Sequence, residues 1–259
     1  MSQIPRATGG SHDFLLRRLH SLTGVVPIGG FLVMHLATNS LVALSSRHAD
    51  HYQNAVDRIH ALEPFLVPVE IVFIFLPIAF HGILGLFIWS ESKPNIRHYP
   101  YWCNYRYTLQ RITGVIVLAF ILVHLWHMHW LGSYLPGGAL FDPRAATPTA
   151  AYAMQSRAVW TVPVYAVGIA AACYHFATGL WTFMITWGIT VGERAQDRMG
   201  YVCAGVGVIL GLAGIAAQVA LMRWPDPAPR ERHAHVQAAA GTESFAPPTW
   251  SADGTFGAR

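Results

Sequence analysis

The sequence IVFIFLPIAFHGILGLFIWS, residues 71–90, contains no Asp, Glu, Lys or Arg. A helix needs about 20 consecutive apolar residues to cross the hydrocarbon core of a bilayer, so this stretch predicts a transmembrane helix. Four further stretches lack the same four residue types and are longer still: residues 19–46, 112–141, 158–192 and 199–222. The sequence therefore predicts an all-α fold, an integral membrane bundle of five transmembrane helices.

The composition of the 259 residues agrees with a membrane protein, since 53% are hydrophobic and 12% are charged. Soluble proteins carry roughly 25% charged residues, so the composition disfavours a soluble fold. The three cysteines, Cys103, Cys173 and Cys203, form no CxxC or CxxCH motif, which excludes zinc ribbons, redox dithiols and covalently attached c-type haem. The net charge of +4 forms no basic stripe, and we expect no nucleic acid partner.

Lysine and arginine are unevenly distributed over the segments between the predicted spans. The N-terminal flank and the second and fourth loops hold nine of them, against four in the first and third loops. The positive-inside rule then places the N-terminus in the cytoplasm and the C-terminus outside, in the cell inner (cytoplasmic) membrane. We predict a cytoplasmic segment at 1–18, a membrane domain at 19–224 and, from its Pro and Gly content, a disordered tail at 225–259. The third loop, from about 132 to 157, is long enough to cover the outer face.

Each of the first four predicted helices carries one histidine deep in its apolar stretch, and these are His35, His81, His124 and His175. Ionisable groups at membrane depth are costly and usually functional. Counted at about 1.5 Å per residue from the charged residue at each helix entrance, His35 and His124 lie in the outer half of the membrane. His81 and His175 lie in the inner half by the same count. The sequence therefore predicts two histidine pairs, each at one depth.

Two histidines from different helices at one depth form the bis-imidazole arrangement that holds a b-type haem at both axial positions. Two such pairs predict two stacked haems b. Three alternatives stay open, namely histidines that only bond a neighbouring helix, a metal-permease site and a copper centre. Permease sites usually include carboxylates, and copper oxidases gather more histidines around one centre, so both fit less well.

Small residues accompany the predicted ligands, and four glycines are candidate spacers for the cofactors: Gly24, Gly85, Gly114 and Gly179. Two of them follow the inner histidines by four residues, on the same helix face. The other two lie in a repeat, LHSLTGV at 19–25 and LQRITGV at 109–115, which matches at four of seven positions. We expect the repeat glycines to leave space for the inner porphyrin, with plain close helix packing as the alternative.

These stretches resemble the membrane-anchor cytochrome b of succinate:quinone oxidoreductases and fumarate reductases, in the subtype with one five-helix subunit and two haems. The resemblance extends from residue 14 to about 222. The segments that carry it are RRLHSLTGVVPIGGFLVMH (17–35), FLPIAFHGILGLF (75–87), LQRITGV through His124, and YHFATGLWTFMITWGIT (174–190). It implies that His81 and His175 bind the inner haem, and that His35 and His124 bind the outer haem.

The resemblance also implies a flavoprotein and an iron–sulfur subunit on the cytoplasmic face, and a membrane quinone, of the menaquinone type in this subtype, as substrate. The sequence has no nucleotide-binding fingerprint and no cluster-binding cysteine pattern, so the chain would be the electron-carrying, quinone-reactive part of the enzyme. Two alternatives stay open: the dihaem anchor of another quinone-linked dehydrogenase or hydrogenase, and a transporter or purely structural anchor that uses its histidines for packing.

Quinone reduction consumes two protons, so a proton-exchanging group is expected beside a haem. Glu70 is the candidate, because it precedes His81 by 11 residues, about 16 Å toward the outside by helix rise. A helix-entry residue that bonds a neighbour is the alternative for this position. Haem propionates and quinone also need polar partners, and the candidates are Arg18, His20, Ser21 and Arg111. These charges would equally serve to dock the iron–sulfur subunit.

Overall fold

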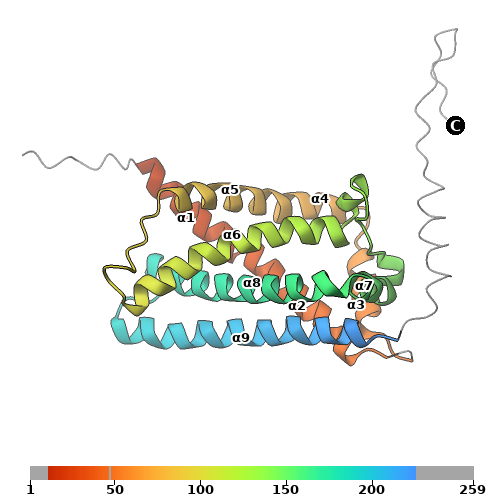
Figure 1. The fold of residues 1–259 in the computed structure, drawn as a ribbon. Coiled ribbons are helices and arrows are strands. Elements are labelled where there is room, and N and C mark those ends of the chain that lie inside the picture. Colours follow the sequence, from red (N-terminus) through yellow and green to blue (C-terminus); the bar gives the residue numbers. More distant parts are fainter. Residues whose placement is uncertain (1–10, 47, 226–259) are drawn as a thin grey trace, which may run out of the picture. The chain divides into compact units, whose positions relative to one another are not determined.

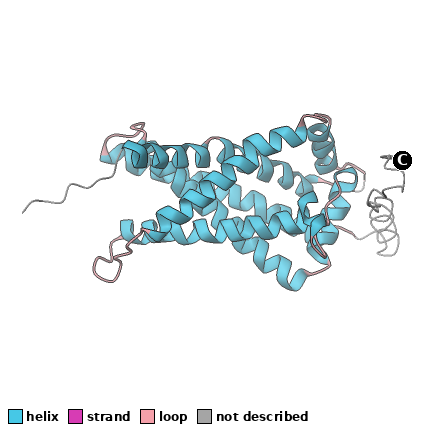
Figure 2. Ribbon diagram, turned by 90° about the horizontal axis from the view of Figure 1, so that it is seen from above, coloured by secondary structure: helices cyan, strands magenta, loops and turns pink. Residues whose placement is uncertain are grey.

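The computed structural model describes residues 11–46 and 48–225. The predicted tail, beyond Pro225, and residues 1–10 of the predicted cytoplasmic segment lie outside the described residues. Every regular element among the described residues is a helix (Figures 1 and 2), which confirms the all-α fold. Five helical stretches are long and apolar enough to cross a membrane: His12–Leu44, Leu66–Ser90, Trp102–Met128, Ala158–Thr186 and Glu193–Arg223.

The first span is divided into α1 (Ser11–Val25), α2 (Pro27–Ser40) and a final turn, η1 (Leu41–Leu44). Pro27 has no backbone N–H and is best tolerated in the first turn of a helix, so the division falls directly before it. The two halves have different neighbours, since α1 packs on α5 and α8 whereas α2 packs mainly on α9. The division therefore lets one span contact both sides of the bundle.

The second span consists of α4 (Leu66–Glu70), a π-helical turn η2 (Ile71–Phe75) and α5 (Leu76–Ser90). Pro77 cannot donate to the carbonyl of Phe73, four residues before it, and its ring crowds that carbonyl. The widened π turn, which ends two residues before Pro77, relieves this conflict. Glu70 is the last residue of α4 and so lies next to the widened turn.

The remaining spans are α6 (Trp102–Met128), α8 (Ala158–Thr186) and α9 (Glu193–Arg223). Helix α8 packs on both α6 and α9, and it lies between them in Figure 1. Helix α6 begins ten residues before the charge-free stretch at 112–141, so it includes Arg106 and Arg111. Long arginine side chains can extend to the polar surface from such positions.

Four short elements lie at one end of the bundle, called here the α7 end: α3 (His51–His60), η3 (Trp130–Tyr134), η4 (Pro143–Ala145) and α7 (Ala146–Gln155). The region predicted as a covering loop thus contains a helix. Asp50 caps α3 by accepting a hydrogen bond from the Gln53 amide at 3.0 Å. Helix α7 is almost wholly buried, and its Met154 packs in a cluster with Val42 and Tyr52. Tertiary packing therefore forms these helices.

Candidate functional site

The structure brings together both histidine pairs that depth predicted. His81 on α5 and His175 on α8 have ring centroids 6.2 Å apart and ring planes at 90°. His35 on α2 and His124 on α6 have ring centroids 5.7 Å apart and ring planes at 82°. All four side chains are partly buried. The pairing in space is confirmed, while the role of the four rings as haem ligands remains a prediction.

Both rings of the His81–His175 pair hydrogen-bond a backbone carbonyl through Nδ1. His81 Nδ1 lies 2.9 Å from the carbonyl oxygen of His20, and His175 Nδ1 lies 3.0 Å from that of Gln110. A carbonyl oxygen only accepts, so each Nδ1 carries the proton and donates it. The Nε2 atom of each neutral ring therefore keeps its lone pair, which is the form that binds a metal. The His20 ring also stacks on the His81 ring, with centroids 3.9 Å apart.

The two carbonyl acceptors come from the repeated sequences. His20 and Gln110 are each the second residue of a repeat, and Gly24 and Gly114 follow them by four residues. Each glycine lies against the ring that its own repeat hydrogen-bonds, and a Cβ atom added at Gly114 would lie 2.9 Å from Cε1 of that ring. We expected these glycines to make room for a porphyrin; in the structure, the side chain nearest to each is the imidazole of a predicted ligand.

Gly85 and Gly179 lie where the ligand helices cross the repeats. A Cβ added at Gly85 would lie 3.3 Å from His20 Cε1, and one added at Gly179 would lie 3.5 Å from Gln110 Nε2. The Gln110 side chain also donates to the carbonyl of His175 at 3.1 Å. The α1–α5 and α6–α8 contacts therefore have the same arrangement. In each, a repeat on the first helix hydrogen-bonds a histidine on the second, and the two histidines, His81 and His175, face each other.

The donor set of the two pairs fits haem b. A metal held between two imidazole nitrogens, at about 2 Å from each, separates the ring centroids by roughly 6 Å. The observed separations of 6.2 and 5.7 Å agree with this value. A porphyrin would supply four of the nitrogen ligands of its iron, so the protein would need to provide only two more, one from each histidine of a pair. Among the described residues, no group of three or more His, Cys, Asp or Glu could hold a metal ion.

The predicted polar contacts for propionates or quinone are Arg18, His20, Ser21 and Arg111. Two of them meet at the indole of Trp187, just after α8 ends. The Arg18 guanidinium lies 5.3 Å from the Trp187 ring centroid, and Ser21 Oγ accepts a hydrogen bond from Trp187 Nε1 at 3.3 Å. Arg111 lies instead over the Tyr107 ring of its own helix, at 3.4 Å. Arg18 and Ser21 thus form one polar group at Trp187, whereas His20 stacks on the His81 ring.

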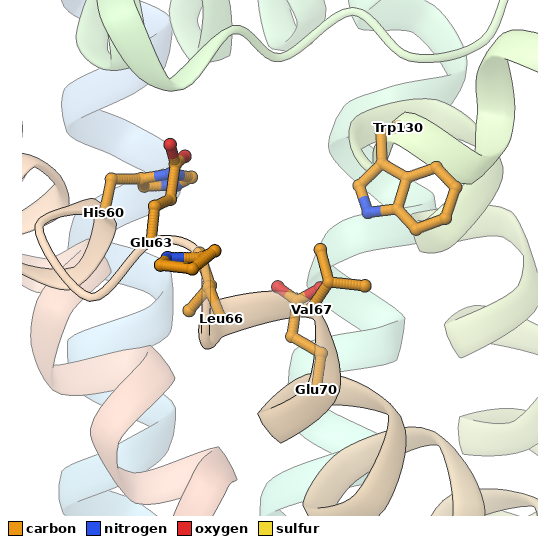
Figure 3. A pocket seen from close by; sticks show the side chains of 7 residues that line it. His60, Glu63, Leu66, Val67, Glu70 and Trp130 are labelled. Carbon is orange, nitrogen blue, oxygen red and sulfur yellow. The ribbon is translucent and has the colours of Figure 1, made fainter.

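Glu70 lies in the wall of a pocket of about 400 Å³ at the α7 end. The pocket is lined by His60, Glu63, Pro64, Leu66, Val67, Glu70 and Trp130 (Figure 3). The Glu70 side chain is 22% exposed, and its Oε2 atom lies 3.7 Å from His129 Nε2. At the pocket edge, His60 Nδ1 lies 3.2 Å from Glu63 Oε1. Two carboxylates and the His60 imidazole therefore line one largely apolar cavity, and the His129 imidazole lies next to one of these carboxylates.

The sequence pattern does not predict two residues next to the His35–His124 pair. The Tyr165 hydroxyl lies 3.3 Å from His124 Nδ1 and 2.8 Å from His127 Nδ1. A single tyrosine within an apolar helix has no spacing signal. His127 follows His124 by three residues, which places both on one helix face, and this spacing was the available clue.

Comparison with known proteins supplies one close relationship. No protein-family model matches the sequence. The chain is 36% identical over 208 residues to the succinate dehydrogenase cytochrome b558 subunit of Bacillus subtilis (strain 168). The matched region covers 80% of this chain and 96% of that protein.

Proposed function

This chain belongs to the family of succinate dehydrogenase cytochrome b subunits, and we propose that it carries electrons through two b haems between an iron–sulfur subunit and a membrane quinone. Membership makes it the multi-pass membrane subunit of an enzyme complex, in agreement with its five apolar helices, and the name cytochrome b implies haem b. The number of haems, their ligands and the quinone belong to the proposal.

We assign His81 and His175 to one haem, and His35 and His124 to the other. The observation that carries this assignment is the His81–His175 pair, whose ring centroids lie 6.2 Å apart. Each ring donates its Nδ1 proton to a backbone carbonyl, which leaves the Nε2 lone pair to bind iron. The haem iron, when bound, supplies reversible one-electron transfer. The chain's own part is to hold the two rings at a fixed spacing and orientation, which the repeats of α1 and α6 do through the backbone.

The pocket at the α7 end is our proposed quinone site. Its volume of about 400 Å³ lies within the range of small-ligand sites, and its apolar walls suit a quinone ring. A quinone oxygen gains a proton for each electron it accepts. Glu70, with His129 beside it, would give that proton, and the more exposed His60–Glu63 pair would replace it from the solvent side. The resemblance favours a low-potential quinone such as menaquinone.

The opposite end of the bundle is our proposed docking face for the iron–sulfur and flavoprotein subunits. Its connections, residues 91–101 and 187–192, join α5 to α6 and α8 to α9. Lys93, Arg97 and the arginines at the nearby helix ends give this end the excess of positive charge found in the sequence. By the positive-inside rule this end is cytoplasmic, with the C-terminal end of α9 outside.

Counting haems in the purified complex tests the ligand assignment. His81→Ala or His175→Ala should each remove the same b haem, and His35→Ala or His124→Ala should each remove the other. His51→Ala serves as the control, because His51 is exposed at the start of α3, outside both histidine pairs and outside the proposed docking face. A pyridine haemochrome assay gives the number of haems per chain, and a reduced-minus-oxidised spectrum identifies which one remains. Retention of both haems in any of the four variants would overturn the assignment.

A further inference from the structure

Tyr165 connects the two histidines of one α6 turn from the neighbouring helix α8. Its hydroxyl oxygen lies 2.8 Å from His127 Nδ1 and 3.3 Å from His124 Nδ1. The Tyr165 side chain is buried, and His127 is completely buried. These contacts form a continuous chain of hydrogen-bonding groups that starts at a proposed haem ligand and ends inside the protein.

The direction of the hydrogen bonds follows from ligation, and so rests on the proposed function. If His124 binds iron through Nε2, the neutral imidazole carries its proton on Nδ1 and donates it to the Tyr165 oxygen. A phenol has a single proton, which is then available for the other neighbour, His127 Nδ1. His127 must therefore act as the acceptor at Nδ1. Every donor in the chain points from the ligand toward His127.

Aromatic packing holds the hydroxyl in this position. The Phe120 ring meets the Tyr165 ring edge-on, with centroids 5.3 Å apart, and it stacks on the His124 ring at 5.8 Å. On the other side, the His127 ring lies 5.0 Å from that of Trp160. The phenol therefore has little freedom to turn toward another partner.

We propose that Tyr165 is a positioning residue for the haem of the His35–His124 pair, with His127 as the last acceptor of the chain. The corresponding acceptors for His81 and His175 are backbone carbonyls, which a substitution cannot remove. At His124 the acceptor is a side chain, so its contribution can be measured directly. An accepted Nδ1 proton makes an imidazole a stronger electron donor to iron and stabilises the oxidised haem.

The test is a redox titration of the whole complex, followed in the visible spectrum. Tyr165→Phe should keep two haems and raise the midpoint potential of the His35–His124 haem only. We expect the ratio of reduced to oxidised haem at a fixed potential to change by about three- to tenfold, as for the loss of one hydrogen bond. Tyr174→Phe is the matched control on α8, because its hydroxyl has no hydrogen-bond partner among the described residues. A midpoint in Tyr165→Phe equal to that in Tyr174→Phe would refute the proposal.

Variants of His127 test the direction of the chain. His127→Leu removes the last acceptor and should shift the same midpoint in the same direction, by less than Tyr165→Phe does. His127→Asn keeps a polar group near the position of Nδ1 and should restore part of the shift. The double variant Tyr165→Phe with His127→Leu should shift no further than Tyr165→Phe alone, since both act in series. Additive shifts would overturn the directed chain.

The ligand assignment is tested separately. Loss of one haem in His124→Ala establishes that His124 is needed for a haem, whatever Tyr165 does. If that variant loses a haem and Tyr165→Phe shifts no midpoint, only the role of Tyr165 fails. If His124→Ala keeps both haems, the proposed function fails with it.

Discussion

Gly114→Ala is expected to weaken the binding of one haem although it adds a single methyl group. The new Cβ would lie 2.9 Å from His175 Cε1, where ordinary contact begins near 3.4 Å, so the ring or the helix must move by about 0.5 Å. The ring has little freedom to move, because its Nδ1 is bonded to the Gln110 carbonyl at 3.0 Å. Overpacking of this kind costs about 1–3 kcal/mol. At 1.4 kcal/mol per tenfold, haem affinity should fall by roughly 5- to 150-fold.

The assay is the occupancy of each haem in complex prepared with limiting haem, from haemochrome and difference spectra. Gly114→Ala should lose the haem of the His81–His175 pair and retain the other. Gly24→Ala, in the first repeat, should lose the same haem, because its Cβ would contact the His81 ring. Gly205→Ala on α9 is the control, since a Cβ there meets nothing within 4 Å. Equal occupancy in Gly114→Ala and Gly205→Ala would show that the ring has room, and that the reasoning from the repeat is wrong.

Three further substitutions have distinct expected outcomes. Glu70→Gln should slow quinone reduction by tenfold or more, as expected when a general acid is removed. Electron transfer to an artificial dye and the haem content should stay unchanged. Quinone turnover at the wild-type rate would exclude Glu70 as the proton donor. Asp50→Ala removes the cap of α3 and should cost about 1 kcal/mol, seen as a lower thermal midpoint of the complex; an unchanged midpoint would mean that packing alone holds α3. Glu91→Gln breaks an ion pair with Arg17, in which the Glu91 and Arg17 side chains are 69% and 54% exposed. Exposed ion pairs contribute less than about 1 kcal/mol, so the thermal midpoint should fall by less than in Asp50→Ala. An equal fall would contradict this expectation.

The histidine pairing was predictable because depth in a membrane helix is a count along the chain. His35 and His124 lie at similar depths on helices that run in the same direction, and the structure places their ring centroids 5.7 Å apart. The glycine repeat was also visible in the sequence, and its role beside a porphyrin stays a prediction. The contact of Gly24 with the His81 ring was not predictable, because residue spacing does not specify the rotation of one helix against another.

Helices α3 and α7 illustrate a second limit of the sequence. Neither is long enough to form alone, and Ala150 and Met154 of α7 become helical through burial against the ends of the spans. Length and apolar character identify a membrane span without any neighbour, whereas a short helix outside the spans depends on the surface that it covers.

The sequence by itself determined the five spans, the one histidine on each of the first four and the depth of each histidine. These are one-dimensional properties, set by the thickness of a bilayer and the rise of an α-helix. Only the tertiary structure decided that the His20 and Gln110 carbonyls orient the His81–His175 pair, and that Tyr165 lies between His124 and His127. Such contacts join residues far apart in the chain, so they depend on the rotation and crossing of whole helices, which the sum of all packing interactions sets.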